Sequence, residues 1–85
     1  MTREELEQTE WGIRLIESVP PVVYNEAFDL ASSPNFSVEI AHRNDLGTWV
    51  WAVIANDSDD FWMDAFDTLE HAVSFCEKMG WNYGK

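Results

Sequence analysis

The sequence predicts an α+β fold in which a three-stranded antiparallel meander is flanked by N-terminal and C-terminal helices. Segments 36–43, 48–55 and 61–66 are rich in β-branched and aromatic residues and are separated by polar turns. Helix-start patterns stand near both ends of the chain. The chain has 85 residues and no recognisable linker, so we expect a single α+β domain over residues 1–85.

The first helix is predicted to begin at Thr2, because Thr2 and Glu5 have the spacing of a capping box. Gly12 should cost this helix about 1 kcal/mol relative to alanine, and Pro20-Pro21 should end it. Its apolar residues recur at helical spacing and form the expected buried stripe: Leu6, Trp11, Ile13, Leu15 and Ile16.

The next segment, residues 22–34, fits two structures. Val22-Val23-Tyr24 could form a short fourth strand or lead into an irregular helical turn around 26–30. Ser32-Ser33-Pro34-Asn35 is a turn cluster.

The three predicted strands differ in pattern. Segment 36–43 alternates between apolar and polar residues, as a strand with one buried face does. Segment 48–55 is apolar on both faces, so it should be central and covered on both sides. Trp49 and Trp51 lie on one side of it. If the third strand is regular, Trp62 shares a face with Asp64 and Phe66.

The last helix is predicted to be capped by Asp67, with Glu70 completing a second capping box. Gly80 followed by Trp81 is typical of a left-handed C-cap with a hydrophobic contact. The expected buried stripe contains Leu69, Ala72, Val73, Phe75, Cys76 and Met79.

The segment 60–83 reads as a strand, an acid-capped helix and a Gly-Trp ending. It resembles the C-terminal strand-helix-Gly-Trp segment of an accessory subunit of respiratory complex I, through Phe66, Thr68, Ala72, Gly80, Trp81 and Tyr83. This resemblance implies a local fold. In size, acidity and aromatic content the chain is similar to small phage-encoded inhibitors of bacterial defence, including anti-CRISPR proteins and DNA mimics, which implies binding to a basic protein surface.

The charge balance narrows the classes of partner. Sixteen Asp and Glu against five Lys and Arg give a net charge of −11. The five cations are dispersed, so we expect no direct binding to nucleic acid or to an anionic membrane. The single cysteine permits no internal disulfide, and the N-terminus lacks a signal-peptide pattern, so we expect a cytoplasmic protein.

Patterns for metal binding and catalysis are incomplete. Asp57-Ser58-Asp59-Asp60 begins like a calcium loop, but its sixth position is Trp62 and its twelfth is Thr68. His42, His71 and Cys76 do not have zinc-ligand spacing. Since there is also no nucleophile elbow or phosphate loop, we expect no metal, no cofactor and no enzyme activity. Paired carboxylates would need a concave site to catalyse acid–base chemistry.

The acidic residues themselves are the candidate partner-binding site. They cluster around one tryptophan, and the candidate set is Asp57, Asp59, Asp60, Trp62, Asp64, Asp67 and Glu70. In the most concrete hypothesis, a phage-type inhibitor mimics nucleic acid to block a defence (CRISPR-like) or nucleic-acid-processing complex. Asp57, Asp59, Asp60 and Asp64 would then substitute for phosphates, with Trp62 as an anchor.

The alternative is a structural accessory subunit or interaction module held by its apolar and aromatic surface. Its charge would then serve solubility alone. A homodimer is compatible with either hypothesis.

Overall fold

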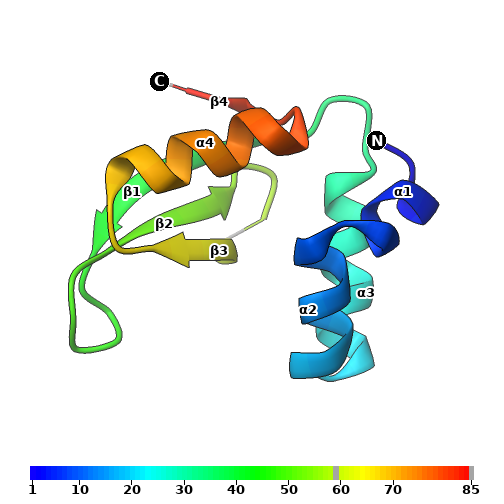
Figure 1. Ribbon diagram of the computed structural model, residues 1–85, viewed down its shortest axis with the longest axis horizontal. Coiled ribbons are helices and arrows are strands. Elements are labelled where there is room, and N and C mark those ends of the chain that lie inside the picture. Colours follow the sequence, from blue (N-terminus) through cyan, green and yellow to red (C-terminus); the bar gives the residue numbers. More distant parts are fainter. Residues whose placement is uncertain (59, 85) are drawn as a thin grey trace. The chain divides into compact units, whose positions relative to one another are not determined.

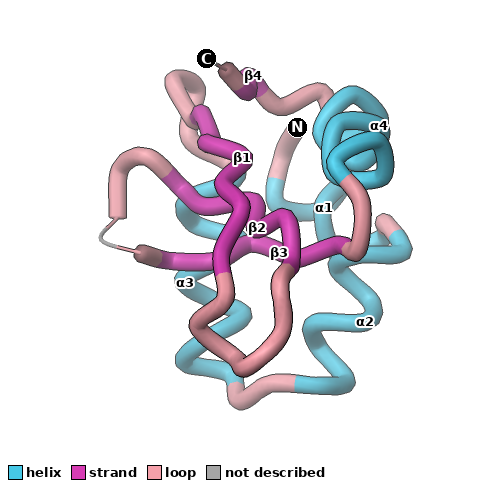
Figure 2. The backbone as a smooth tube through the Cα atoms, turned by 90° about the vertical axis from the view of Figure 1, so that its left-hand side faces the viewer, coloured by secondary structure: helices cyan, strands magenta, loops and turns pink. Residues whose placement is uncertain are grey.

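The computed structural model describes residues 1–58 and 60–84. The chain divides into two compact units, Met1–Asn35 and Phe36–Lys85, which we call the N-terminal and C-terminal units and describe in turn (Figure 1). The expectation of a single domain stays a prediction. The α+β class is confirmed: helices at both ends of the chain accompany a four-stranded mixed sheet (Figure 2).

The N-terminal unit consists of three helices, α1 (Arg3–Gln8), α2 (Glu10–Ser18) and α3 (Pro21–Ala31). The predicted capping box is present, since the Glu5 amide donates to Thr2 Oγ1 at 3.2 Å and the Thr2 amide donates to Glu5 Oε1 at 2.8 Å. The prediction of a single first helix is wrong, because the backbone is extended at Thr9. The Thr9 hydroxyl donates to the Leu6 carbonyl at 2.7 Å and accepts from the Gly12 amide at 3.0 Å, so it ends α1 and begins α2.

Gly12 has a role that its helix propensity does not reveal. A Cβ at this position would lie 2.0 Å from the Leu6 carbonyl oxygen. The start of α2 therefore approaches the end of α1 too closely for any larger residue. The expected buried stripe is correct at Leu6 and Trp11 and wrong at Ile13 and Ile16, which are 48% and 41% exposed, because the break at Thr9 changes the face that α2 buries.

Residues 21–31 form a helix, so no strand forms near Val22. Pro20-Pro21 follows the end of α2 as predicted but also begins α3, because the fixed φ of proline suits the first helical turn. Ala27, Phe28 and Ala31 are buried, and the Trp11 ring meets Phe28 edge to face at 5.7 Å.

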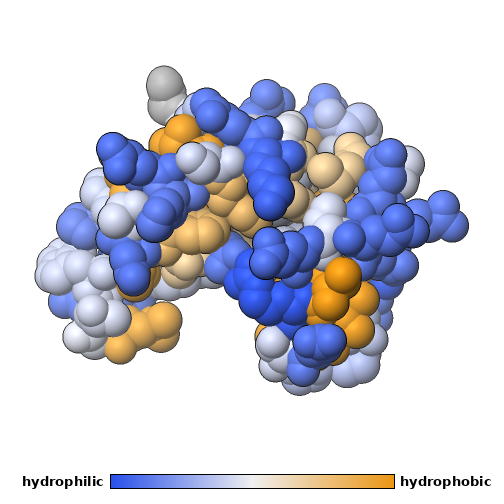
Figure 3. Space-filling model, in the orientation of Figure 1, coloured by the Kyte–Doolittle hydropathy of each residue, from blue (hydrophilic) through white to orange (hydrophobic). Residues whose placement is uncertain are grey.

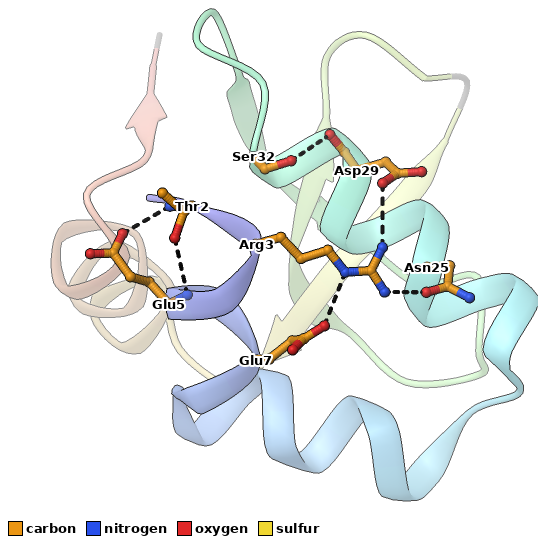
Figure 4. A network of polar contacts seen from close by, with 7 residues as sticks. All are labelled: Thr2, Arg3, Glu5, Glu7, Asn25, Asp29 and Ser32. Carbon is orange, nitrogen blue, oxygen red and sulfur yellow. Dashed lines mark hydrogen bonds and ion pairs between the residues drawn. The ribbon is translucent and has the colours of Figure 1, made fainter.

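A polar network around Arg3 links α1 to α3 (Figure 4). The Arg3 Nε donates to Glu7 Oε2 at 3.0 Å, and the guanidinium also donates to Asn25. It pairs with Asp29 at 3.6 Å and lies 5.3 Å above the centre of the Phe28 ring. One half-buried arginine thus bridges two carboxylates and an aromatic ring.

The C-terminal unit contains β1 (Ser37–Arg43), β2 (Val50–Ala55), β3 (Phe61–Phe66), α4 (Leu69–Met79) and β4 (Asn82–Tyr83). The strand order is β3-β2-β1-β4, with β1 to β3 antiparallel and β4 parallel to β1. The meander is confirmed, and β2 is central as predicted. Residues on both faces of β2 are buried, including Ala52, Val53 and Ile54. The fourth strand is at the C-terminus.

One face of the sheet packs against α4, which Figure 1 shows lying along the strands. The Phe66 ring is 5.1 Å from the Phe75 ring of α4, and Trp51 is the register partner of Phe66, so the face that includes Trp51, Val53 and Phe66 is the α4 face. Trp81 meets the rings of both Phe75 and Phe36 edge to face.

The ends of α4 match the prediction at one end only. Gly80 is left-handed at φ 73°, and the Trp81 amide donates to the Cys76 carbonyl at 3.0 Å, as predicted for the Gly-Trp ending. At the other end the Thr68 hydroxyl accepts from the His71 amide at 3.1 Å. The predicted Asp67 cap and its capping box with Glu70 are therefore wrong by one residue, because a threonine hydroxyl already occupies the cap position.

Candidate functional site

Four of the predicted acidic residues lie at two opposite ends of β3. Asp57 and Asp60 belong to the turn between β2 and β3, where the strand begins. Asp67 and Glu70 are exposed at the other end, where the chain enters α4. Asp59 lies outside the described residues. The acids that are contiguous in sequence are therefore not contiguous on one edge of the sheet.

The expectation that Trp62 shares a face with Asp64 is wrong. Asp64 is the register partner of Val53 and Trp62 is the partner of Ile54, with a β-bulge between the two pairs. Since successive residues of β2 point to opposite faces, Trp62 and Asp64 do as well. Asp64 lies on the α4 face and accepts the Ala65 amide at 2.8 Å.

Asp60 is held by an arginine of β1. Arg43 Nη1 donates to Asp60 Oδ1 at 2.8 Å, and Nη2 donates to Oδ2 at 3.2 Å. The same guanidinium binds Asp45 through Nε at 3.1 Å and lies 5.5 Å above the centre of the Trp62 ring. We call these four residues the Arg43 cluster. It joins the turn after β1 to the turn before β3.

The charges of the Arg43 cluster stabilise one another. The hydrogen bonds that Arg43 donates to Asp45 and Asp60 raise the Arg43 pKa, and the same bond to Asp60 is the main cause of a lowered Asp60 pKa. The cluster is solvent-exposed, so its ion pairs contribute little to folding. Asp60 also has a φ of 52°, a left-handed conformation that aspartate tolerates. Asp60 and Trp62 thus already engage a cation of their own chain.

The end of the sheet where β1 leads into β2 carries exposed aromatic and apolar side chains. His42 stacks on Trp51 with ring centroids 4.3 Å apart and planes 7° from parallel, and it also meets Trp49 at 4.7 Å. Trp49 is 59% exposed and Leu46 is 73% exposed. We call His42, Leu46, Trp49 and Trp51 the aromatic end. Figure 3 shows an apolar patch over the connection between β1 and β2.

Acidic residues belong to the two chain segments at the aromatic end, and one of them, Asp45, is bound to Arg43. Trp51 pairs with Phe66 at the last position of β3, so segments 44–49 and 67–70 leave the sheet at the same end. These segments contain Asp45, Asp67 and Glu70 and no Lys or Arg. Leu69, in the first turn of α4, is 44% exposed. Two of the predicted site residues, Asp67 and Glu70, thus belong near this end.

Sequence reasoning missed His42 and Leu46. It placed Trp49 and Trp51 on one side of the central strand, and both do contact His42. The contact between His42 and the two tryptophans could have been predicted from the hairpin, because pairing β1 with β2 across the turn at 44–49 sets His42 opposite Trp51. That register depends on the length of the turn, which composition alone does not define.

The described residues offer little for metal or thiol chemistry. Within 1–58 and 60–84, no three His, Cys, Asp or Glu side chains converge as a metal site. Cys76 is fully buried, and that burial raises its pKa to about 11, which disfavours the nucleophilic thiolate. Within the same residues, no helix has both the length and the apolar character needed to cross a bilayer.

Comparisons with known proteins add no assignment. No family model, no curated protein and no solved structure matches the chain.

Proposed function

We propose that this chain is a non-enzymatic binding protein that docks an acidic, aromatic surface on a basic protein partner. The observation that carries the proposal is the exposure of Trp49, 59% open to solvent although its ring packs against His42. Large exposed aromatic residues are typical anchors of protein interfaces. Acids at the same end of the sheet select for a basic partner.

The net charge of −11 supports the same partner class. A surface of this sign repels nucleic acid and accelerates association with Lys- and Arg-rich proteins. Both units are acidic, with seven carboxylates against two arginines in 1–35 and nine against three cations in 36–85. Long-range attraction would therefore not depend on a single cluster, whereas the anchoring contact would.

A finer form of the proposal is a phage-type inhibitor that mimics nucleic acid. In this form Asp57, Asp59, Asp60 and Asp64 occupy a channel that normally binds phosphates. The aromatic end has better support as the docking surface, since Asp60 is paired with Arg43 and since Trp62 and Asp64 point to opposite faces. The double variant Asp59→Asn, Asp60→Asn separates the two forms: a large loss of affinity favours the row of aspartates.

The partner can be sought by immobilising the chain, incubating it with a bacterial lysate and eluting with salt. Affinity is then measured with the purified partner from about 50 mM to about 500 mM salt, a range over which exposed charges become screened. We expect Trp49→Ala and Asp67→Asn each to weaken binding and Asp57→Asn to have less effect. Affinity that neither salt nor any of these variants changes would exclude the proposal and favour apolar docking.

A further inference from the structure

We propose that the aromatic end binds an arginine side chain of the partner. The guanidinium would stack on the exposed face of Trp49, and the carboxylates of Asp67 and Glu70 would neutralise it. This inference depends on the proposed function and deepens it by naming the residue that the surface recognises.

The chain already binds its own arginines with this combination of groups. Arg43 lies 5.5 Å above the Trp62 ring and is bound to Asp45 and Asp60. A guanidinium is planar and weakly hydrated, so it can stack on a ring while its N–H groups reach carboxylates at the side.

Arg3 repeats the arrangement in the other unit. It lies 5.3 Å above the Phe28 ring and is paired with Glu7 and Asp29. A ring next to carboxylates is therefore the recurrent guanidinium-binding arrangement within this chain. At the aromatic end an exposed ring, Trp49, lies at the same end of the sheet as the exposed carboxylates of Asp67 and Glu70.

Trp49 is held in a suitable position for such a contact. Its ring meets His42 of β1, which is stacked nearly parallel on Trp51 of β2, so the ring of Trp49, in the turn between these strands, packs against a stacked pair. Packing of this kind restricts the side chain before binding, so it lowers the conformational-entropy cost of forming the complex. Of the aromatic side chains, tryptophan also attracts cations most strongly.

The charge of this end favours arginine over an apolar partner residue. Segments 44–49 and 67–70 contain no Lys or Arg, and they carry Asp67 and Glu70 in addition to Asp45. Arg43, the nearest arginine in sequence, is already bound to Asp45 and Asp60. Lysine can supply the charge, but its compact, strongly hydrated ammonium stacks less well on a ring.

The test uses the intact chain and two synthetic peptides that are identical except that one carries arginine where the other carries lysine. The NMR signal of the Trp49 indole N–H, assigned by its absence from Trp49→Phe, is followed during titration at about 50 mM salt. We expect the arginine peptide to shift this signal and to bind more tightly than the lysine peptide. Trp49→Ala should reduce the affinity for the arginine peptide about two- to fivefold and abolish the preference for arginine over lysine.

A matched pair of charge variants locates the site. Asp67→Asn and Asp57→Asn each remove one exposed aspartate, at opposite ends of β3. We expect Asp67→Asn to reduce the affinity for the arginine peptide more than Asp57→Asn does. Circular dichroism of each variant verifies that the fold is retained.

The outcomes separate this inference from the proposed function. If both peptides bind equally, the Trp49 signal does not move and the two aspartate variants are equivalent, then the arginine site is wrong and general docking on basic surfaces stands. If an uncharged apolar peptide shifts the Trp49 signal as strongly at any salt concentration, an apolar occupant replaces arginine. If no basic peptide binds, both proposals fail.

Discussion

Replacing Gly12 with alanine should destabilise the N-terminal unit, although alanine is the better helix former. The added Cβ would lie 2.0 Å from the Leu6 carbonyl oxygen, 2.9 Å from the Leu6 carbonyl carbon and 3.1 Å from the Glu7 Cα. All three are backbone atoms, so no side-chain rotation can relieve the contact. Either α1 must move away from α2, or the Thr9 hydroxyl must lose its bonds to Leu6 and Gly12.

The magnitude follows from three contributions. Helix propensity favours alanine by about 1 kcal/mol. Loss of the two Thr9 hydrogen bonds costs about 1 kcal/mol each, and overpacking a tight site costs about 1–3 kcal/mol. Together these contributions lower the free energy of unfolding by about 2–4 kcal/mol, which lowers the melting temperature by roughly 10 °C or more in a chain of this size.

Urea denaturation followed by tryptophan fluorescence and by circular dichroism measures this loss. Ser18→Ala is the matched control, because it places alanine at an exposed position of the same helix. A Gly12→Ala protein as stable as the wild type, or more stable, would refute the close approach of α1 to α2.

Three further results are expected. Thr68→Ala should lower the free energy of unfolding by about 1 kcal/mol, whereas Asp67→Ala should lower it less, because the Thr68 hydroxyl accepts the hydrogen bond from the His71 amide at the start of α4. Urea denaturation of the two variants distinguishes these effects. Arg43→Gln should raise the Asp60 pKa toward its ordinary value of 3.8, as measured by NMR titration of the carboxyl carbon. Because the Asp60 pKa is lowered in the folded wild type, this group stabilises the fold above pH 3.8, and the contribution is lost as the pH falls through the folded-state pKa. An Asp60 titration that is the same in Arg43→Gln as in the wild type would contradict the pairing of Asp60 with Arg43. The Cys76 thiol, buried and with its pKa raised to about 11, should react with a thiol reagent at pH 8 far more slowly in the folded protein than in denaturant, and equal rates would contradict its burial.

The sheet and the last helix could be predicted because their signals are local. Alternating apolar residues locate the meander, and the doubly apolar pattern of β2 identifies the central strand. The Gly80-Trp81 pair marks the end of α4, since a left-handed residue there needs no distant contact.

The features that were missed depend on contacts between distant segments or on competing local bonds. Thr9 lies within a helical pattern, but its hydroxyl competes with the helix for backbone groups and divides the pattern in two. The bulge between the partners of Val53 and Ile54 turns Trp62 away from Asp64, and strand alternation cannot reveal it.

The sequence predicted the chemical character of the candidate site better than the positions of its residues. An acidic, aromatic surface was expected, and Asp67 and Glu70 do lie at the end of the sheet where Trp49 is exposed. Asp60 and Trp62 instead bind Arg43, which is 17 residues from Asp60 in sequence. Such an ion pair depends on strand register, so composition does not predict it.

The most direct measurement is the affinity of the chain for the arginine peptide, or for its purified partner, as a function of salt in the wild type and in Asp67→Asn. We predict that the wild-type affinity falls steeply as salt rises and that Asp67→Asn binds more weakly and responds less to salt. Affinity that stays constant across the salt range and is the same in both proteins would contradict docking through an acidic, aromatic surface.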